Sequence, residues 1–162
     1  MPSTPAFAWA SEIERTLELV VERCGDPAPQ IYARVFAQHP QMKPYFWRDT
    51  NDAVKGEMLA RTFDAILDFI GERRYADHMI GNEIITHEGY DVPREVFASF
   101  FTIIRDSFRE ILGSDWSPAF ETAWSALLAD IDHYVQKTPR VGSQSAVSNA
   151  LREKFESGQL TP

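Results

Sequence analysis

Residues 86–113 read THEGYDVPREVFASFFTIIRDSFREILG, and this stretch decides the fold. After Pro93, apolar residues recur three or four positions apart until Gly113, which is the pattern of an amphipathic helix. The residues of this apolar face include Phe97, Phe101, Ile104 and Phe108. Before Pro93, a second helical segment ends at His87, and a loop that contains a glycine follows it. The stretch therefore predicts two helices joined by a short loop, with a histidine closing the first.

The rest of the chain shows the same pattern on both sides of this stretch. Apolar residues at helical spacing predict further helices over residues 9–24, 27–38, 52–70, 75–87 and from Ser117-Pro118 to a stop at Pro139. A short turn over residues 41–45 separates the second helix from the third. No part of the sequence has the pattern of a pair of strands. We predict an all-α fold of about six to seven helices.

Composition and charge limit the classes of partner. The 162-residue chain has a formal net charge of −8, and such an acidic balance repels phosphate backbones and anionic lipid. We expect no nucleic-acid partner and no membrane partner. Cys24 is the one cysteine, so no disulfide can form within a chain, and we expect it to be a small buried hydrophobe. Signal-peptide features and a membrane-spanning apolar run are both missing, which predicts a cytoplasmic protein.

The last part of the chain differs from the rest. Residues 141–148 are small and polar, as in a linker, and residues 149–156 could form a short charged helix. We expect one domain over residues 1–139 and a C-terminal extension over residues 140–162. This tail could pack on the domain, mediate dimer contacts or stay mobile, so both a monomer and a homodimer remain open.

Few residues have the spacing that catalysis or metal binding requires. The chain has no glycine-rich phosphate loop and no glycine-flanked nucleophilic serine, and four widely spaced histidines do not make a zinc site. His87 is distinguished by its position. An imidazole at the end of a helix can offer one nitrogen to a metal while the other donates to a carbonyl one turn earlier. The chain also has the aromatic and branched residues that a flat slot for haem would need.

Three segments, in their order and spacing, are similar to segments of globins. They are IYARVFAQHP at residues 31–40 followed by Tyr45-Phe46, THEGYDV at residues 86–92, and EILG at residues 110–113 followed by Ala123-Trp124 and Ala129-Asp130. Over roughly residues 10–137 the chain resembles bacterial single-domain globins and the globin domain of flavohaemoglobins. The resemblance implies a globin-like fold, haem b (iron protoporphyrin IX) as cofactor, and dioxygen or another diatomic gas as ligand.

The resemblance also implies a role for individual residues. His87 matches the proximal iron ligand, Phe46 the aromatic that stacks on the haem, and Tyr32 the distal tyrosine whose hydroxyl donates to the bound gas. On the following helix, Lys55 falls at the distal gate and Leu59 over the iron. Further pocket positions beyond the proximal loop fall on Val92, Phe97 and Phe101. Tyr32 could instead be a core tyrosine that satisfies a carbonyl.

The chain departs from the family at two places. Lys55 stands where His or Gln is usual; it could reach a haem propionate, donate to the gas or bind iron. A register shift of one to three residues would place Val54 or Met58 in the pocket instead. Phe97 stands where flavohaemoglobins have a tyrosine that acts on the proximal histidine, and no acidic residue clearly takes the part of their glutamate.

Three functional hypotheses follow from these observations. We favour a haem globin that binds a diatomic gas and is not by itself an enzyme. The chain has no flavin or nicotinamide module, so turnover such as nitric oxide oxidation would need a separate reductase. The alternatives are a gas-sensing or redox-sensing interaction module that signals through the tail, and a globin fold that has lost haem or binds another tetrapyrrole such as a bilin.

Overall fold

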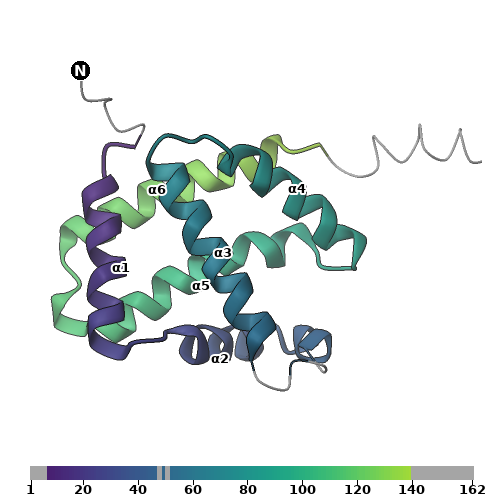
Figure 1. Cartoon of the computed structure of the whole chain (residues 1–162), viewed down its shortest axis with the longest axis horizontal. Coiled ribbons are helices and arrows are strands. Elements are labelled where there is room, and N and C mark those ends of the chain that lie inside the picture. The colour runs from purple at the N-terminus through teal and green to yellow at the C-terminus, as the bar shows by residue number, and fades with distance from the viewer. Residues whose placement is uncertain (1–6, 47–48, 50–51, 140–162) are drawn as a thin grey trace, which may run out of the picture.

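The computed structural model describes residues 7–46, 49 and 52–139 (Figure 1). Within these residues it has six α-helices, two short 3-10 helices and no strand, which confirms the predicted all-α fold. The elements are α1 (Ala10–Cys24), α2 (Ala28–Gln38), η1 (Pro40–Phe46), α3 (Ala53–Ile70), α4 (Ala76–Gly89), α5 (Arg94–Leu112), η2 (Gly113–Asp115) and α6 (Pro118–Lys137). The proposed tail, residues 140–162, lies outside the described residues.

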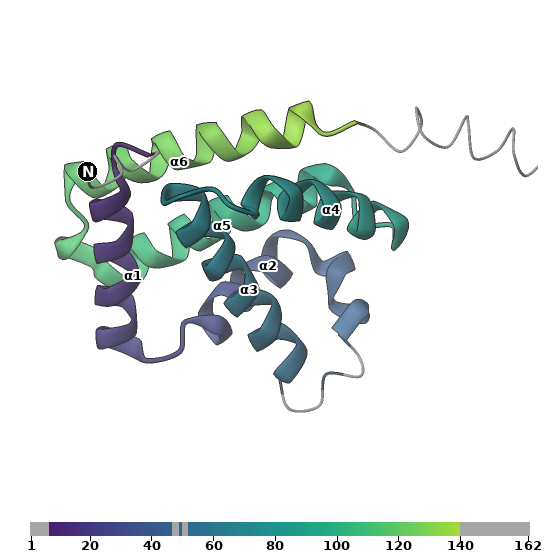
Figure 2. The ribbon, with the colours of Figure 1, turned by 45° about the horizontal axis from the view of Figure 1, so that its top comes forward.

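Helix α5 is the centre of the fold, and it contacts α1, α2, α4 and α6. After η2, α6 lies over α5 and runs back in the opposite direction, while α1 crosses the ends of both (Figures 1 and 2). On the other side of the molecule, α2 packs on α3, α3 on α4, and α4 on α5. These four helices form a closed ring of contacts, and the candidate site lies within it.

The core between α1, α5 and α6 is built around Trp124. Its side chain is fully buried, and the edge of its ring meets Phe108 with the ring centroids 5.5 Å apart. The indole N–H donates to Thr16 Oγ1 at 3.0 Å, and the Thr16 hydroxyl donates in turn to the Ile13 carbonyl at 2.7 Å. Both buried polar groups are therefore satisfied, as a stable core requires.

The helices end close to the residues at which the sequence predicts them to end. Gly25 and Gly113 end α1 and α5 in the left-handed region, at φ of 74° and 52°, which glycine adopts without strain. Helix α4 continues to Gly89, so part of the loop predicted after His87 is its last helical turn. Cys24 is exposed, and the expectation that it is buried was wrong. None of the helices in the described ranges is long and apolar enough to cross a membrane.

Ser117 caps the start of α6, as its place before Pro118 predicts. The Ser117 hydroxyl accepts a hydrogen bond from the Phe120 N–H at 3.2 Å. We expect Ser117→Ala to lower the free energy of unfolding by about 1 kcal/mol, because one helix N–H loses its partner. Urea unfolding followed by circular dichroism measures this change. Ser125→Ala, at an exposed position in the same helix, should have no effect or stabilise slightly. Equal losses in both variants would contradict the cap.

Candidate cofactor site

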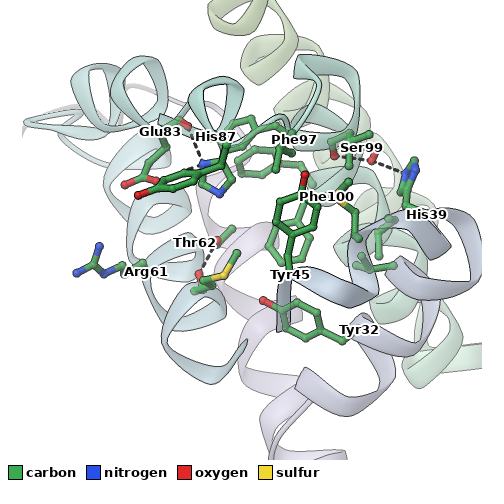
Figure 3. A pocket seen from close by; sticks show the side chains of 18 of the residues that line it. Tyr32, His39, Tyr45, Arg61, Thr62, Glu83, His87, Phe97, Ser99 and Phe100 are labelled. Carbon is green, nitrogen blue, oxygen red and sulfur yellow. Dashed lines mark hydrogen bonds and ion pairs between the residues drawn. The ribbon is translucent and has the colours of Figure 1, made fainter. Parts of the chain in front are cut away.

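The ring of helices and η1 line a cavity of about 470 Å³ that is open to solvent on one side (Figure 3). This volume is within the range of small-molecule and cofactor sites. Its walls are mostly apolar and aromatic. The aromatic lining consists of Tyr32, Tyr45, Phe46, Tyr90, Phe97, Phe100 and Phe101, and the aliphatic lining of Val35, Met42, Val54, Met58, Ala65, Met79, Ile80, Val92, Val96 and Ile103. The polar lining residues are His39, Arg61, Thr62, Glu83, His87 and Ser99.

His87 lies in the last turn of α4, is half-buried and lines the cavity. Its Nδ1 lies 2.7 Å from the carbonyl oxygen of Glu83, one turn earlier. Because a carbonyl can only accept, Nδ1 carries a proton, and in the neutral imidazole Nε2 then keeps its lone pair free for a metal. The ring also packs against Phe97 on α5, with the two centroids 5.2 Å apart. These two contacts hold the imidazole in one orientation, as the hydrogen-bond partners of a metal-binding histidine do.

The side chain of Glu83 brings an acidic group to this histidine. Its Oε2 lies 3.5 Å from His87 Nδ1, and Figure 3 shows the two side chains together at one end of the cavity. From the sequence, no acidic residue was clearly assigned the part of the flavohaemoglobin glutamate. The four-residue spacing between Glu83 and His87 could have identified it, because residues four apart share one face of a helix.

Tyr32 is buried, with 4% of its surface exposed, and lines the wall that α2 contributes. Its hydroxyl donates to the Lys55 carbonyl at 3.1 Å. Its ring packs in an aromatic cluster with Phe46 and Phe100, at centroid distances of 5.7 and 5.8 Å. Burial, and to a smaller extent the charge of Asp49, raises the pKa of the Tyr32 phenol, so it stays neutral and can donate.

The cavity brings together six of the eight predicted pocket residues. These are Tyr32, Phe46, His87, Val92, Phe97 and Phe101. The two predicted residues on α3, Lys55 and Leu59, are not among the lining residues, and Leu59 is buried in the core instead. From α3 the lining residues are Val54, Met58, Arg61, Thr62 and Ala65. This placement corresponds to the register shifted by one residue, because Val54 and Met58 share the helix face that meets the cavity.

Ion pairs hold Lys55 at the start of α3. Its ammonium lies 2.9 Å from a carboxylate oxygen of Asp49 and 2.9 Å from one of Asp52. The Asp49 side chain is 1% exposed and also accepts from the backbone N–H groups of Val54 and Lys55, at 3.0 and 3.1 Å. Burial alone would raise the pKa of the Asp49 carboxyl, but the hydrogen bond from the Lys55 ammonium and those from the two backbone N–H groups hold this pKa below its usual value. The hydrogen bonds to Asp52 and Asp49 raise the pKa of Lys55.

The described residues contain no cluster of three or more histidine, cysteine or acidic side chains that could hold a metal ion. A metal at His87 would therefore need most of its ligands from another molecule. Haem meets this requirement, since the porphyrin supplies four nitrogens and the protein supplies one axial ligand. The apolar cavity, the aromatic walls and the free Nε2 of His87 fit such a group.

Comparison with known proteins agrees with this geometry. A family model for globins matches residues 29–135, so the chain belongs to the globin family. A search of curated proteins finds no significant relative. The matched range runs from α2 to α6 and contains all the residues that line the cavity. Globins are in general haem-binding proteins of all-α fold, and the resemblance inferred from the sequence is confirmed at the level of the family.

Proposed function

We propose that this globin binds haem b through His87 Nε2 and binds a diatomic gas on the face of the porphyrin opposite to His87. The observation that carries the proposal is His87 itself. Its Nδ1–H is fixed on the Glu83 carbonyl at 2.7 Å, so Nε2 is the nitrogen left for iron in a mostly apolar cavity. Haem supplies an iron whose remaining axial position binds oxygen, carbon monoxide or nitric oxide.

The walls of the cavity favour a large apolar ring. Burying apolar surface contributes roughly 25 cal/mol per Å², and the aromatic side chains offer flat faces for packing. Phe46 on η1 and Phe97 on α5 both line the cavity. Arg61 is the one arginine or lysine among the lining residues described. Its exposed guanidinium pairs with Glu57 at 3.3 Å and would exchange this partner for an acidic group of the cofactor.

The carboxylate of Glu83 increases the electron density on the His87 imidazole. A carboxylate oxygen 3.5 Å from Nδ1 attracts the proton on that nitrogen. The imidazole then becomes a stronger donor to the metal through Nε2, because a carboxylate near the other ring nitrogen raises the basicity of a metal-bound histidine. The Glu83 side chain is partly exposed, so solvent weakens this effect.

Tyr32 is the proposed hydrogen-bond donor to the gas. To donate, its hydroxyl has to leave the Lys55 carbonyl, so only the difference between the two hydrogen bonds favours the gas. We expect this difference to be about 1 kcal/mol. Tyr32→Phe should then release oxygen about five-fold faster, as measured by stopped-flow displacement. Carbon monoxide release should change little, because this ligand carries less negative charge.

Tyr45→Phe is the matched control for Tyr32. Tyr45 also lines the cavity, but it is exposed and its hydroxyl lies 3.5 Å from the Asp91 carbonyl. Its loss should leave both release rates unchanged. If Tyr32→Phe and the wild type release oxygen at the same rate, Tyr32 is a core tyrosine and its hydroxyl serves only the Lys55 carbonyl.

Titration of the haem-free protein with hemin tests the proposal. We expect saturation at one haem per chain with a Soret band, and after reduction a further shift of this band on adding carbon monoxide. Absence of a Soret band would contradict the proposal. A parallel titration with biliverdin distinguishes the alternative tetrapyrrole. Tighter binding of biliverdin than of hemin would mean that the cavity binds a bilin and not haem.

A further inference from the structure

Arg94 is a buried arginine directly after the loop that follows α4. Its side chain is 4% exposed. Nη1 donates to the carbonyls of Val135 and Thr138 at 3.1 and 2.7 Å, and Nη2 donates to the Pro139 carbonyl at 3.2 Å and to Glu88 Oε1 at 2.8 Å. One guanidinium therefore joins the C-terminal end of α6 to the last turn of α4.

These contacts explain why a charge can be buried at this position. The last carbonyls of a helix have no partner within the helix and carry partial negative charge, which a cation stabilises. The planar guanidinium reaches one such carbonyl, that of Val135, together with the carbonyls of Thr138 and Pro139 just beyond the end of α6 and one carboxylate. The carboxylate of Glu88 balances the positive charge, so removal of Glu88 would leave a buried cation without its counter-ion.

Glu88 is the residue next to His87 in the chain, and both lie in the last turn of α4. The His87 carbonyl is also held, because it accepts from the N–H groups of Tyr90 and Val92 at 3.0 and 2.9 Å. Rotation of this turn about the helix axis would carry the imidazole with it. The ion pair with Arg94 opposes this rotation by anchoring the turn to α6.

We propose that Arg94 and Glu88 are positioning residues that set the orientation of the His87 imidazole toward the haem. The proposal rests on the proposed function, since it concerns the same ligand. Neither residue lines the cavity. They act through the backbone of the last turn of α4, which they fix against the end of α6.

A second arginine provides a matched control. Arg73, just after α3, has Nη2 2.9 Å from an Asp130 carboxylate oxygen, and its Nε donates to the Phe69 carbonyl at 2.7 Å. It joins the end of α3 to α6, as Arg94 joins the end of α4 to α6. None of Arg73, Phe69 and Asp130 lines the cavity, and Arg73 makes no contact with α4 among its hydrogen bonds and ion pairs in the described part of the chain.

The experiment compares the iron–histidine stretching band of the reduced, haem-loaded proteins by resonance Raman spectroscopy. Glu88→Ala and Arg94→Met should shift or broaden this band, because the imidazole is less firmly oriented. Arg73→Met should lower the thermal unfolding temperature and leave the band unchanged. Glu88→Gln, which keeps an acceptor oxygen for Arg94, should recover part of the wild-type band position.

The outcomes separate the two proposals. If Arg94→Met does not fold, Glu88→Ala still tests the inference, because Arg94 keeps its three carbonyl acceptors there. An unchanged band in folded, haem-loaded Glu88→Ala would overturn the positioning role and leave the proposed function standing. If the wild type itself shows no iron–histidine band, the proposed function fails and this inference fails with it.

Discussion

His87→Gly is expected to abolish stable haem binding. The variant loses the imidazole whose Nδ1 is fixed on the Glu83 carbonyl, so that its Nε2 is available to a metal in the cavity. Loss of an outer-shell partner typically lowers metal affinity about 10- to 100-fold, and we expect loss of the ligand itself to exceed this. The measurement is the rate of haem transfer to an excess of a haem-free acceptor protein. Free imidazole, which can enter the space left by the side chain, should slow the transfer again.

His39→Ala is the control for this prediction. His39 lines the same cavity, but its Nε2 is engaged with the Ser99 hydroxyl at 3.0 Å (Figure 3). Removing it takes an imidazole from the cavity without removing the proposed ligand, so haem transfer should stay close to the wild-type rate. If His39→Ala loses haem as fast as His87→Gly, or if His87→Gly keeps its haem without imidazole, the assignment of His87 is wrong.

The sequence predicts the helices well because their signals are local. The start of α6 is set by Ser117 and Pro118, and the ends of α1 and α5 by Gly25 and Gly113, which act within one turn of the chain. The amphipathic face of α5 also follows from the spacing of its own residues. Burial of a single residue depends on distant elements. For this reason Cys24, which ends a helix with an apolar face, was expected to be buried and is exposed.

Within the site, Phe46 on η1, His87 on α4, and Phe97 and Phe101 on α5 line the cavity, and the sequence had assigned each of them to the pocket. The register of α3 is different. Its start depends on how Asp49 caps the helix, and the Asp49 carboxylate accepts from the N–H groups of Val54 and Lys55. A shift of one residue turns a helix by about 100°, which exchanges Lys55 for Val54 at the cavity wall. Spacing alone could not decide between these registers.

Trp124→Ala is expected to have the largest effect on stability. A large aromatic side chain removed from a core typically lowers the free energy of unfolding by about 3–5 kcal/mol, which is a large part of the roughly 5–15 kcal/mol of a typical domain. Here the loss includes the contact with Phe108 and the hydrogen bond to Thr16 Oγ1. Urea unfolding of the haem-free protein measures it. Trp124→Phe, which keeps most of the ring, should lose less.

Trp116→Ala is the matched control, because Trp116 is only half-buried and its indole donates to Glu121 at 2.7 Å. The Trp116→Ala variant should lose less free energy of unfolding than Trp124→Ala. Since Trp124 does not line the cavity, the haem-loaded Trp124→Ala protein should keep the wild-type Soret band at temperatures where it is folded. A changed band in the folded protein would show that the core of α1, α5 and α6 also shapes the cavity. An equal loss of stability in both variants would contradict the central role of Trp124 in that core.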